Sequence, residues 1–192
     1  EEYNIKPVKF TGSHNDYSPD ATFKFQSCEA IGITTYSTLF NSNSQFSDVD
    51  TLIFDDAHAA ENYVSNCWSL EISLYSNKDL FNSIKELILP FIDENDRIRF
   101  EKSNDTDIDL QFVNKLPTPS FIRIKDSLYK LLDKYCIDSN TIFKWRMIKD
   151  HLHACHLYFT HNQFLLRPLI PPTEYFEPFT NASQRIYMSA TL

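Results

Sequence analysis

Three short runs rich in apolar residues lie in the first part of the chain, at residues 5–10, 30–35 and 49–54. Short runs with apolar residues on both faces are typical of strands in a parallel sheet that helices cover. The polar stretch 11–20 is predicted to be a turn, and residues 36–40 are predicted to begin a helix. The pattern in this part of the chain therefore predicts strands with short connections.

After residue 56 the apolar residues recur three and four positions apart, which is the period of an amphipathic helix. This spacing predicts helices over 59–70, 78–92, 120–136 and 141–155. The stretch 97–119 is polar, rich in Asp and Asn, and contains two prolines, so it is predicted to be a loop with at most one short strand.

Alternation of apolar and polar residues returns near the C-terminus. Residues 157–159 and 164–166 flank the polar tetrapeptide 160–163, which predicts a hairpin, and 185–188 predicts a last strand. We therefore expect an α/β fold.

Composition narrows the class of protein. The 192 residues are 42% hydrophobic, enough for a packed core, and the length fits one domain with an insertion. The net charge of −8 gives no hint of a basic face for nucleic acid. Four scattered cysteines without a C-x-x-C pair resemble reduced cytosolic thiols, and no apolar run is long enough to cross a membrane. We expect a cytoplasmic protein with no membrane partner.

The chain has only two glycines, Gly12 and Gly32. A phosphate-binding P-loop needs two glycines five positions apart, the second followed by Lys. These glycines are twenty positions apart and neither precedes Lys, so any nucleotide chemistry must take its P-loop from elsewhere. Because the chain lacks an initiator Met and stops in mid-pattern, we expect it to be a piece of a longer protein.

The sharpest chemical signal is the sequence Asp55-Asp56-Ala57-His58, which follows the apolar run 49–54. In a parallel sheet, ligands bind at the carboxyl ends of the strands. One carboxylate there can hold Mg²⁺ on a nucleotide, and a second can orient or deprotonate an attacking water. The alternative is structural: Asp56 caps a helix and Asp55 is a solvated strand end.

A second signal is Ser189-Ala190-Thr191, which follows the predicted strand 185–188. Two hydroxyl groups at a strand end can hydrogen-bond an acidic motif at a neighbouring strand end. The order of the two motifs is more specific than either motif alone.

In this order the motifs resemble those of superfamily 2 helicases: D-D-A-H their D-E-A-H box and S-A-T-L their third motif. The segment 33–39 resembles the place where these enzymes grip single-stranded DNA. The long separation of the two motifs, and L-L-R-P-L-I-P-P before the second, are similar to XPD/DinG-type DNA helicases. The resemblance implies a RecA-like parallel sheet interrupted by a mostly helical insertion, with a motor-domain fragment at 1–75, an arch-like insertion at 76–155 and a return to the sheet at 156–192.

The resemblance also implies roles. Asp55 would coordinate the Mg²⁺ of ATP, and Asp56 would stand where the family has a Glu that polarises the attacking water. His58, Ser189 and Thr191 would couple the nucleotide state to DNA binding.

The same resemblance places Thr34, Thr35 and Tyr36 on the side of the single-stranded DNA. The P-loop segment and the second motor domain would lie in flanking sequence or in a partner, so the 192 residues alone are expected not to hydrolyse ATP. The shorter side chain of Asp56 implies slow hydrolysis.

Two further groups carry weaker signals. Trp145 and Arg146, in the most basic helix, fit base stacking on single strands, or core packing in the case of the ring. His151, His153, His156 and His161, together with Cys155, look like metal ligands, but no single helix face collects three of them, and His161 falls in the predicted hairpin turn.

Two rival functions stay open. One is a non-catalytic ATPase-like scaffold, in which Asp56 marks lost catalysis and the insertion binds a partner protein. The other is a metal-dependent hydrolase that uses the Asp pair and the His cluster.

Overall fold

A computed structural model describes residues 6–41, 44–101, 112–137 and 139–189. The fold is mixed α/β, with 51% helix and 21% strand, and neither class dominates enough to make it all-α or all-β. The chain divides into two compact units, which are treated separately here. The first comprises Glu1–Val64 with Thr173–Leu192, and the second comprises Ser65–Pro172.

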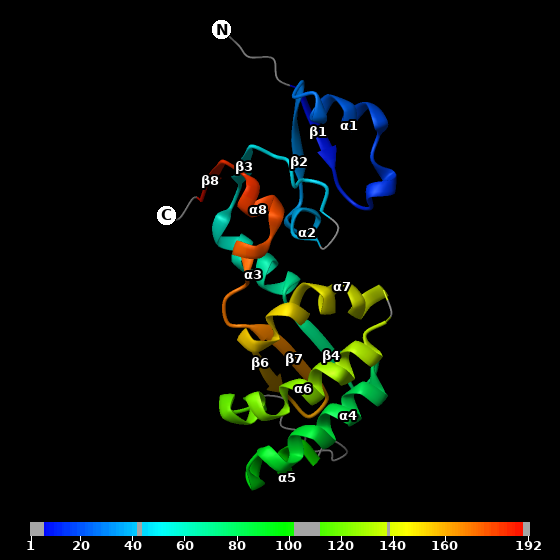
Figure 1. Ribbon diagram of the computed structural model, residues 1–192, viewed down its shortest axis with the longest axis vertical. Coiled ribbons are helices and arrows are strands. Elements are labelled where there is room, and N and C mark those ends of the chain that lie inside the picture. The colour runs from blue at the N-terminus through cyan, green and yellow to red at the C-terminus, as the bar shows by residue number, and fades with distance from the viewer. Residues whose placement is uncertain (1–5, 42–43, 102–111, 138, 190–192) are drawn as a thin grey trace. The chain divides into compact units, whose positions relative to one another are not determined.

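Two parallel strand pairs form the framework of the first unit (Figure 1). Strand β1 (Lys6–Phe10) pairs with β2 (Ala30–Thr34), and β3 (Thr51–Phe54) pairs with β8 (Gln184–Tyr187). Parallel strands need a crossover connection, and the helix α1 (Pro19–Gln26) lies in the connection from β1 to β2. The remaining short helices of this unit are η1 (His14–Asp16), α2 (Tyr36–Leu39), η4 (Thr173–Tyr175) and α8 (Glu177–Asn181).

One glycine of the first unit is required by packing. A Cβ on Gly32 would lie 2.8 Å from a ring carbon of Phe25 and 3.3 Å from one of Phe10. Phe10, Phe25 and Phe46 contact one another edge to face, with ring centroids 5.2–5.9 Å apart. Helix α1 therefore rests on β2 at the one position where the strand has no side chain.

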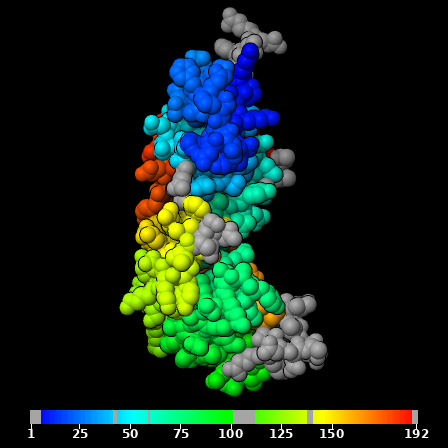
Figure 2. All heavy atoms as spheres, turned by 90° about the vertical axis from the view of Figure 1, so that its right-hand side faces the viewer, coloured from blue at the N-terminus to red at the C-terminus, as the bar shows by residue number. Residues whose placement is uncertain are grey.

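The second unit is built on an antiparallel sheet of order β4-β7-β6-β5. Its strands are β4 (Leu70–Ser73), β5 (Asn114–Lys115), β6 (Cys155–Phe159) and β7 (Gln163–Pro168). The helices α4, α6 and α7 pack with this sheet and form one surface of the unit (Figure 2). The helical segments are α4 (Lys78–Ile88), η2 (Leu89–Phe91), α5 (Glu94–Glu101), α6 (Thr118–Tyr135), α7 (Ser139–Ile148) and η3 (Lys149–Ala154).

Helix α6 illustrates why these residues form helices. Its buried side chains, Phe121, Ile124, Leu128 and Leu132, recur three and four positions apart and so share one face. Pro119 lies in its first turn, where a missing N–H costs nothing. The helix α3 (Ala57–Cys67) spans the boundary between the two units.

Most of the predicted elements are confirmed. The strands predicted at 5–10, 30–35, 49–54 and 185–188 correspond to β1, β2, β3 and β8. The predicted hairpin is formed by β6 and β7. The helices predicted at 78–92 and 120–136 are α4 with η2, and α6.

Three local predictions were wrong. Residues 94–101, placed partly in a loop, form α5, which buries Phe100 completely against neighbouring rings. Leu70, assigned to a helix, begins β4, because its pairing with Leu166 of β7 overrides the helical spacing. Residues 19–26, largely unassigned, form α1.

The structure shows the coarser part of the expected architecture, a mixed α/β fold. Among the described residues, parallel pairing is limited to the two pairs above, with no large parallel sheet. The segment 156–192 was expected to return to one parallel sheet, yet β6 and β7 pair with β4 and β5, and only β8 pairs with β3. The block expected to be mostly helical shares its compact unit with these antiparallel strands, since the unit runs from Ser65 to Pro172.

No helix in the described part of the chain is both long and apolar enough to cross a membrane.

Candidate functional site

Strand β3 ends in an exposed acidic turn. Its burial alternates, with Leu52 and Phe54 buried, and the strand stops at Phe54. Asp55 and Asp56 form the turn between β3 and α3, and both side chains are exposed. His58 lies in the first turn of α3 and is also exposed. Two exposed carboxylates therefore follow the end of a strand, as the sequence predicted.

The backbone of the turn is unusual at Asp56, which has φ +50°. Only Gly, Asn and Asp adopt this left-handed region readily. The Asp56 N–H donates to a carboxylate oxygen of Asp55 at 3.0 Å, and the Asp56 carbonyl accepts from the N–H of Ala60 at 3.2 Å. The turn is thus held from both sides.

This geometry bears on whether Asp56 is simply a helix cap. An N-cap residue normally has extended backbone, and its side-chain oxygen accepts a hydrogen bond from an N–H of the first turn. Asp56 has a left-handed backbone, and within the described residues its carboxylate accepts no hydrogen bond. The Asp56 carboxylate is therefore available to a ligand.

The end of strand β8, which leads to the second motif, lies beside the acidic turn. The parallel register pairs Phe54 with Tyr187, and the Met188 N–H donates to the Phe54 carbonyl at 2.9 Å. The Ala57 N–H in turn donates to the Met188 carbonyl at 2.9 Å. The strands that lead to the two motifs thus end at the same edge. Ser189 is half-buried just beyond, and Thr191 lies outside the described residues.

The proposed DNA-side residues follow β2, and one of them reaches the acidic turn. The hydroxyl of Tyr36 donates to the carbonyl oxygen of Asp55 at 2.6 Å. Burial, followed by the charges of Asp55 and Asp56, raises the pKa of Tyr36 above its ordinary value. The hydroxyls of Thr34 and Thr35 bond elsewhere. The Thr34 hydroxyl donates to the Phe10 carbonyl at 2.8 Å, and the Thr35 hydroxyl caps α2.

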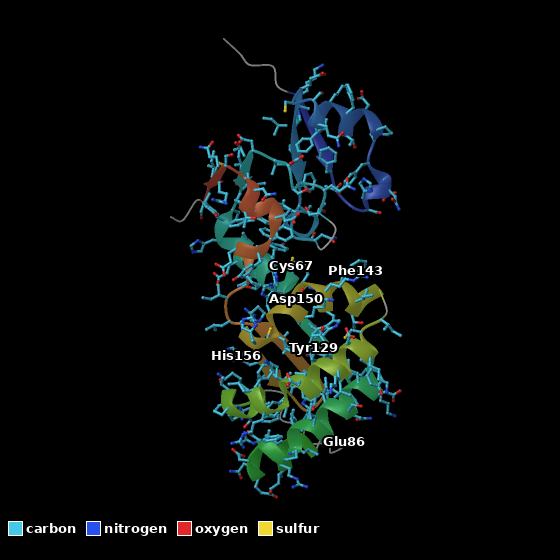
Figure 3. All side chains as sticks on the ribbon, viewed as in Figure 1. Cys67, Glu86, Tyr129, Phe143, Asp150 and His156 are labelled. Atoms are coloured by element: carbon cyan, nitrogen blue, oxygen red, sulfur yellow. The ribbon has the colours of Figure 1, made fainter. Side chains whose placement is uncertain are left out.

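Trp145 and Arg146 lie in the second unit and differ in exposure. The ring of Trp145 is 3% exposed, donates through Nε1 to Asp133 at 3.3 Å, and meets Tyr129 edge to face, a residue labelled on α6 in Figure 3. Arg146 is exposed. Trp145 thus packs in the core of its unit, which is the structural alternative that the sequence left open.

The histidine cluster spreads over different elements. His151 and His153 belong to η3, whereas Cys155 and His156 begin β6, where Figure 3 labels His156. Burial raises the pKa of the Cys155 thiol to about 12, which disfavours the thiolate that a metal needs. Within the described ranges, no three His, Cys, Asp or Glu side chains come together in a way that could hold a metal ion.

The carboxylate pair suits Mg²⁺ better than it suits zinc. Mg²⁺ prefers oxygen ligands, keeps several waters, and is commonly held by one or two carboxylates together with substrate phosphates. Asp55 and Asp56 offer two exposed carboxylates at one turn, and Asp55 keeps one oxygen on the Asp56 N–H. The chemistry of these two carboxylates fits an Mg²⁺ ion carried on a nucleotide.

Sequence reasoning missed the contact between Tyr36 and Asp55. The residues are nineteen positions apart, and each follows the end of a different strand. A polar aromatic residue just after one strand end, with an acidic turn after another, was the signal present in the sequence. It could not be used without knowing how the strands lie in space.

Comparison with known proteins assigns no family: no protein-family model and no curated protein matches the chain.

Proposed function

We propose that the chain belongs to the first motor domain of an ATP-dependent DNA helicase, with a RecA-like sheet, and that the turn Asp55–Asp56 is its Mg²⁺–nucleotide site. The observation that carries the proposal is the parallel pairing of β3 with β8. This pairing brings the strands leading to D-D-A-H and to S-A-T-L to one edge, where the carboxylates are exposed. Nucleotides bind at the carboxyl ends of parallel strands.

In this proposal each acidic residue has a separate task. Asp55 would hold the Mg²⁺ of ATP, which would supply positive charge next to the transferred phosphoryl group. Asp56 orients or deprotonates the water that attacks the γ-phosphate. His58, Ser189 and Thr191 respond to the nucleotide and pass its state to the DNA side.

The single strand of DNA is proposed to contact Thr34, Thr35 and Tyr36, at the carboxyl end of strand β2. Arg146 is exposed and could neutralise a backbone phosphate. Trp145 contributes to the fold of its unit rather than to stacking, because its ring is buried. The P-loop and the arginine finger of the second motor domain must come from other polypeptide segments, since the two glycines cannot form a P-loop.

One observation favours a second candidate, a non-catalytic ATPase-like scaffold. Asp56 stands where the resembled family has Glu, and its carboxylate is one methylene closer to the backbone. A scaffold would bind nucleotide without turning it over.

Steady-state hydrolysis of Mg–ATP with single-stranded oligonucleotide distinguishes the two candidates. The assay uses the complete product of the gene. The helicase proposal expects DNA-stimulated hydrolysis, reduced more than a hundredfold by Asp55→Ala and unchanged by Asp48→Ala, an exposed Asp outside the motif. Nucleotide binding without hydrolysis would favour the scaffold. Stoichiometric zinc or manganese in the purified protein would instead favour a metal-dependent hydrolase.

A further inference from the structure

The phenol of Tyr36 is fixed by ring contacts on two sides. Its ring stacks on Phe54 of β3, with centroids 6.1 Å apart and planes 9° apart. It also stacks on Tyr63 of α3, at 6.0 Å and 14°. Offset stacking at these separations is favourable and orients the ring. The Tyr36 hydroxyl is therefore held in place before it makes any hydrogen bond.

The bond made by this hydroxyl is aimed at the backbone of the acidic turn. It donates to the carbonyl oxygen of Asp55 at 2.6 Å. That carbonyl belongs to the peptide plane that joins Asp55 to Asp56, so holding it restrains ψ of Asp55 and φ of Asp56, the torsions on either side of this plane. The same peptide group supplies the N–H that donates to the Asp55 carboxylate.

The turn has a reason to need this restraint. Asp56 is in the left-handed region at φ +50°, which is less favourable than ordinary backbone for a residue with a Cβ. Its carbonyl and the N–H of Ala57 are tied to Ala60 and Met188, whereas the Asp55 carbonyl is tied to Tyr36. Removing the Tyr36 hydroxyl would leave one end of the strained turn without its restraint.

We propose that Tyr36 is a positioning residue for the Asp55–Asp56 turn, acting through the Asp55 carbonyl and not through contact with nucleotide. This inference rests on the proposed function for the role of the turn, but the restraint itself exists without ligand. It adds to the proposed DNA contact of Tyr36, because the Tyr36 hydroxyl is already bonded to the protein. DNA bound at residues 34–36 would contact Tyr36, the side chain that restrains the acidic turn.

Amide hydrogen exchange measured by NMR on the 192-residue chain tests the restraint directly. In Tyr36→Phe the stacking ring is kept and the hydroxyl is lost. The amides of Asp56 and Ala57 should then exchange about tenfold faster, in line with the loss of one hydrogen bond. The amide of Ile72, in the sheet of the second unit, is the internal reference and should not change.

Tyr63→Phe is the matched control. Tyr63 stacks on the same ring, and in the described part of the chain its hydroxyl makes no hydrogen bond. Unchanged exchange at Asp56 and Ala57 in Tyr36→Phe would overturn the proposal. An equal change in Tyr63→Phe would overturn it too, because ring packing would then explain the effect.

Hydrolysis by the complete gene product separates this inference from the proposed function. If the wild type hydrolyses ATP, Tyr36→Phe should lower kcat about tenfold and change KM for ATP less than threefold, while Tyr63→Phe matches wild type. An unaffected kcat in Tyr36→Phe, with activity lost in Asp55→Ala, would contradict the positioning role alone. Absence of hydrolysis in wild type would contradict the proposed function, and the exchange experiment would still decide on the restraint.

Discussion

The two units differ in how completely they bury their strands. In the second unit, helices cover the inward side chains of the antiparallel sheet. Four of these side chains are fully buried: Ile72, Leu157, Phe164 and Leu166. In the first unit, apolar strand residues stay open: Ile31 is 51% exposed, Ile33 48% and Ile53 55%. These three residues alternate with less exposed positions of β2 and β3.

The contrast shows that the unit with the more completely buried sheet is not the unit that carries the proposed site. The usual pattern is the opposite, since an antiparallel sheet can face solvent on one side and parallel strands are usually covered on both faces. The acidic turn belongs to the more open unit, where its backbone is held by individual hydrogen bonds and stacked rings rather than by a sealed core. Changes in the second unit should therefore act on stability, and changes at the turn should act on function.

Thiol labelling should show the largest difference. The Cys155 pKa of about 12 lies three units above the ordinary value of 9.0, so at pH 8 its thiolate should be about a thousandfold scarcer than that of an ordinary thiol. Cys28 of the first unit is exposed. Alkylation followed by mass spectrometry should modify the exposed Cys28 well before the buried Cys155. Raising the pH toward 10 should accelerate Cys155 about tenfold per unit, and comparable rates for the two thiols at pH 8 would contradict its burial.

Core truncation should show the next largest effect. Ile84 is completely buried in α4, whereas Ile33 is half-exposed in β2. Ile84→Ala should cost about 3–4 kcal/mol in the free energy of unfolding, because it removes buried methylenes and leaves a cavity. The same change at Ile33 should cost less than about 1 kcal/mol. Urea unfolding of both variants would measure this, and equal losses would break the contrast between the units.

A smaller effect is expected at Gly32. Its new Cβ in Gly32→Ala would meet the ring of Phe25, which must shift against Phe10 and Phe46. Overpacking of this kind should cost about 1–2 kcal/mol. Gly12→Ala, where the nearest atom is 3.9 Å away, separates crowding from backbone strain, since Gly12 has φ +82°. If Phe25→Leu did not relieve the Gly32→Ala loss, crowding by the ring would be the wrong explanation.

The smallest stability effect is expected at Asp56. Asp56→Gly removes the carboxylate but suits φ +50°, so the free energy of unfolding should change by less than about 0.5 kcal/mol. Asp56→Ala removes the same carboxylate and should cost about 1 kcal/mol through the left-handed backbone. Thermal unfolding of the pair reports this difference, while both variants should lose hydrolysis equally. A Gly variant less stable than the Ala variant would contradict the left-handed turn.

The sequence was informative where local signals were strong. The apolar run 49–54 and the abrupt Asp55-Asp56 that follows it predicted a strand that ends in exposed carboxylates. The strand at 185–188 was predicted too. Each of these strands follows from residues that are close in sequence, whereas the parallel pairing of β3 with β8 joins residues far apart in the chain.

The parts that failed depend on contacts distant in sequence. Leu70 continues a helical spacing, but it pairs with Leu166 of β7, which lies ninety-six positions later in the sequence. Helix α5 has hardly any apolar stripe, and the tertiary burial of Phe100 helps to hold it in place. The Tyr36–Asp55 bond joins two strand ends whose proximity no local pattern records.

The most direct test of the central claim is the rate of ATP hydrolysis by the complete gene product, with and without single-stranded DNA, in wild type and Asp55→Ala. The proposed role of the acidic turn predicts Mg²⁺-dependent, DNA-stimulated hydrolysis in wild type and a loss of more than a hundredfold in the variant. Hydrolysis that survives Asp55→Ala, or that ignores both DNA and Mg²⁺, would contradict it.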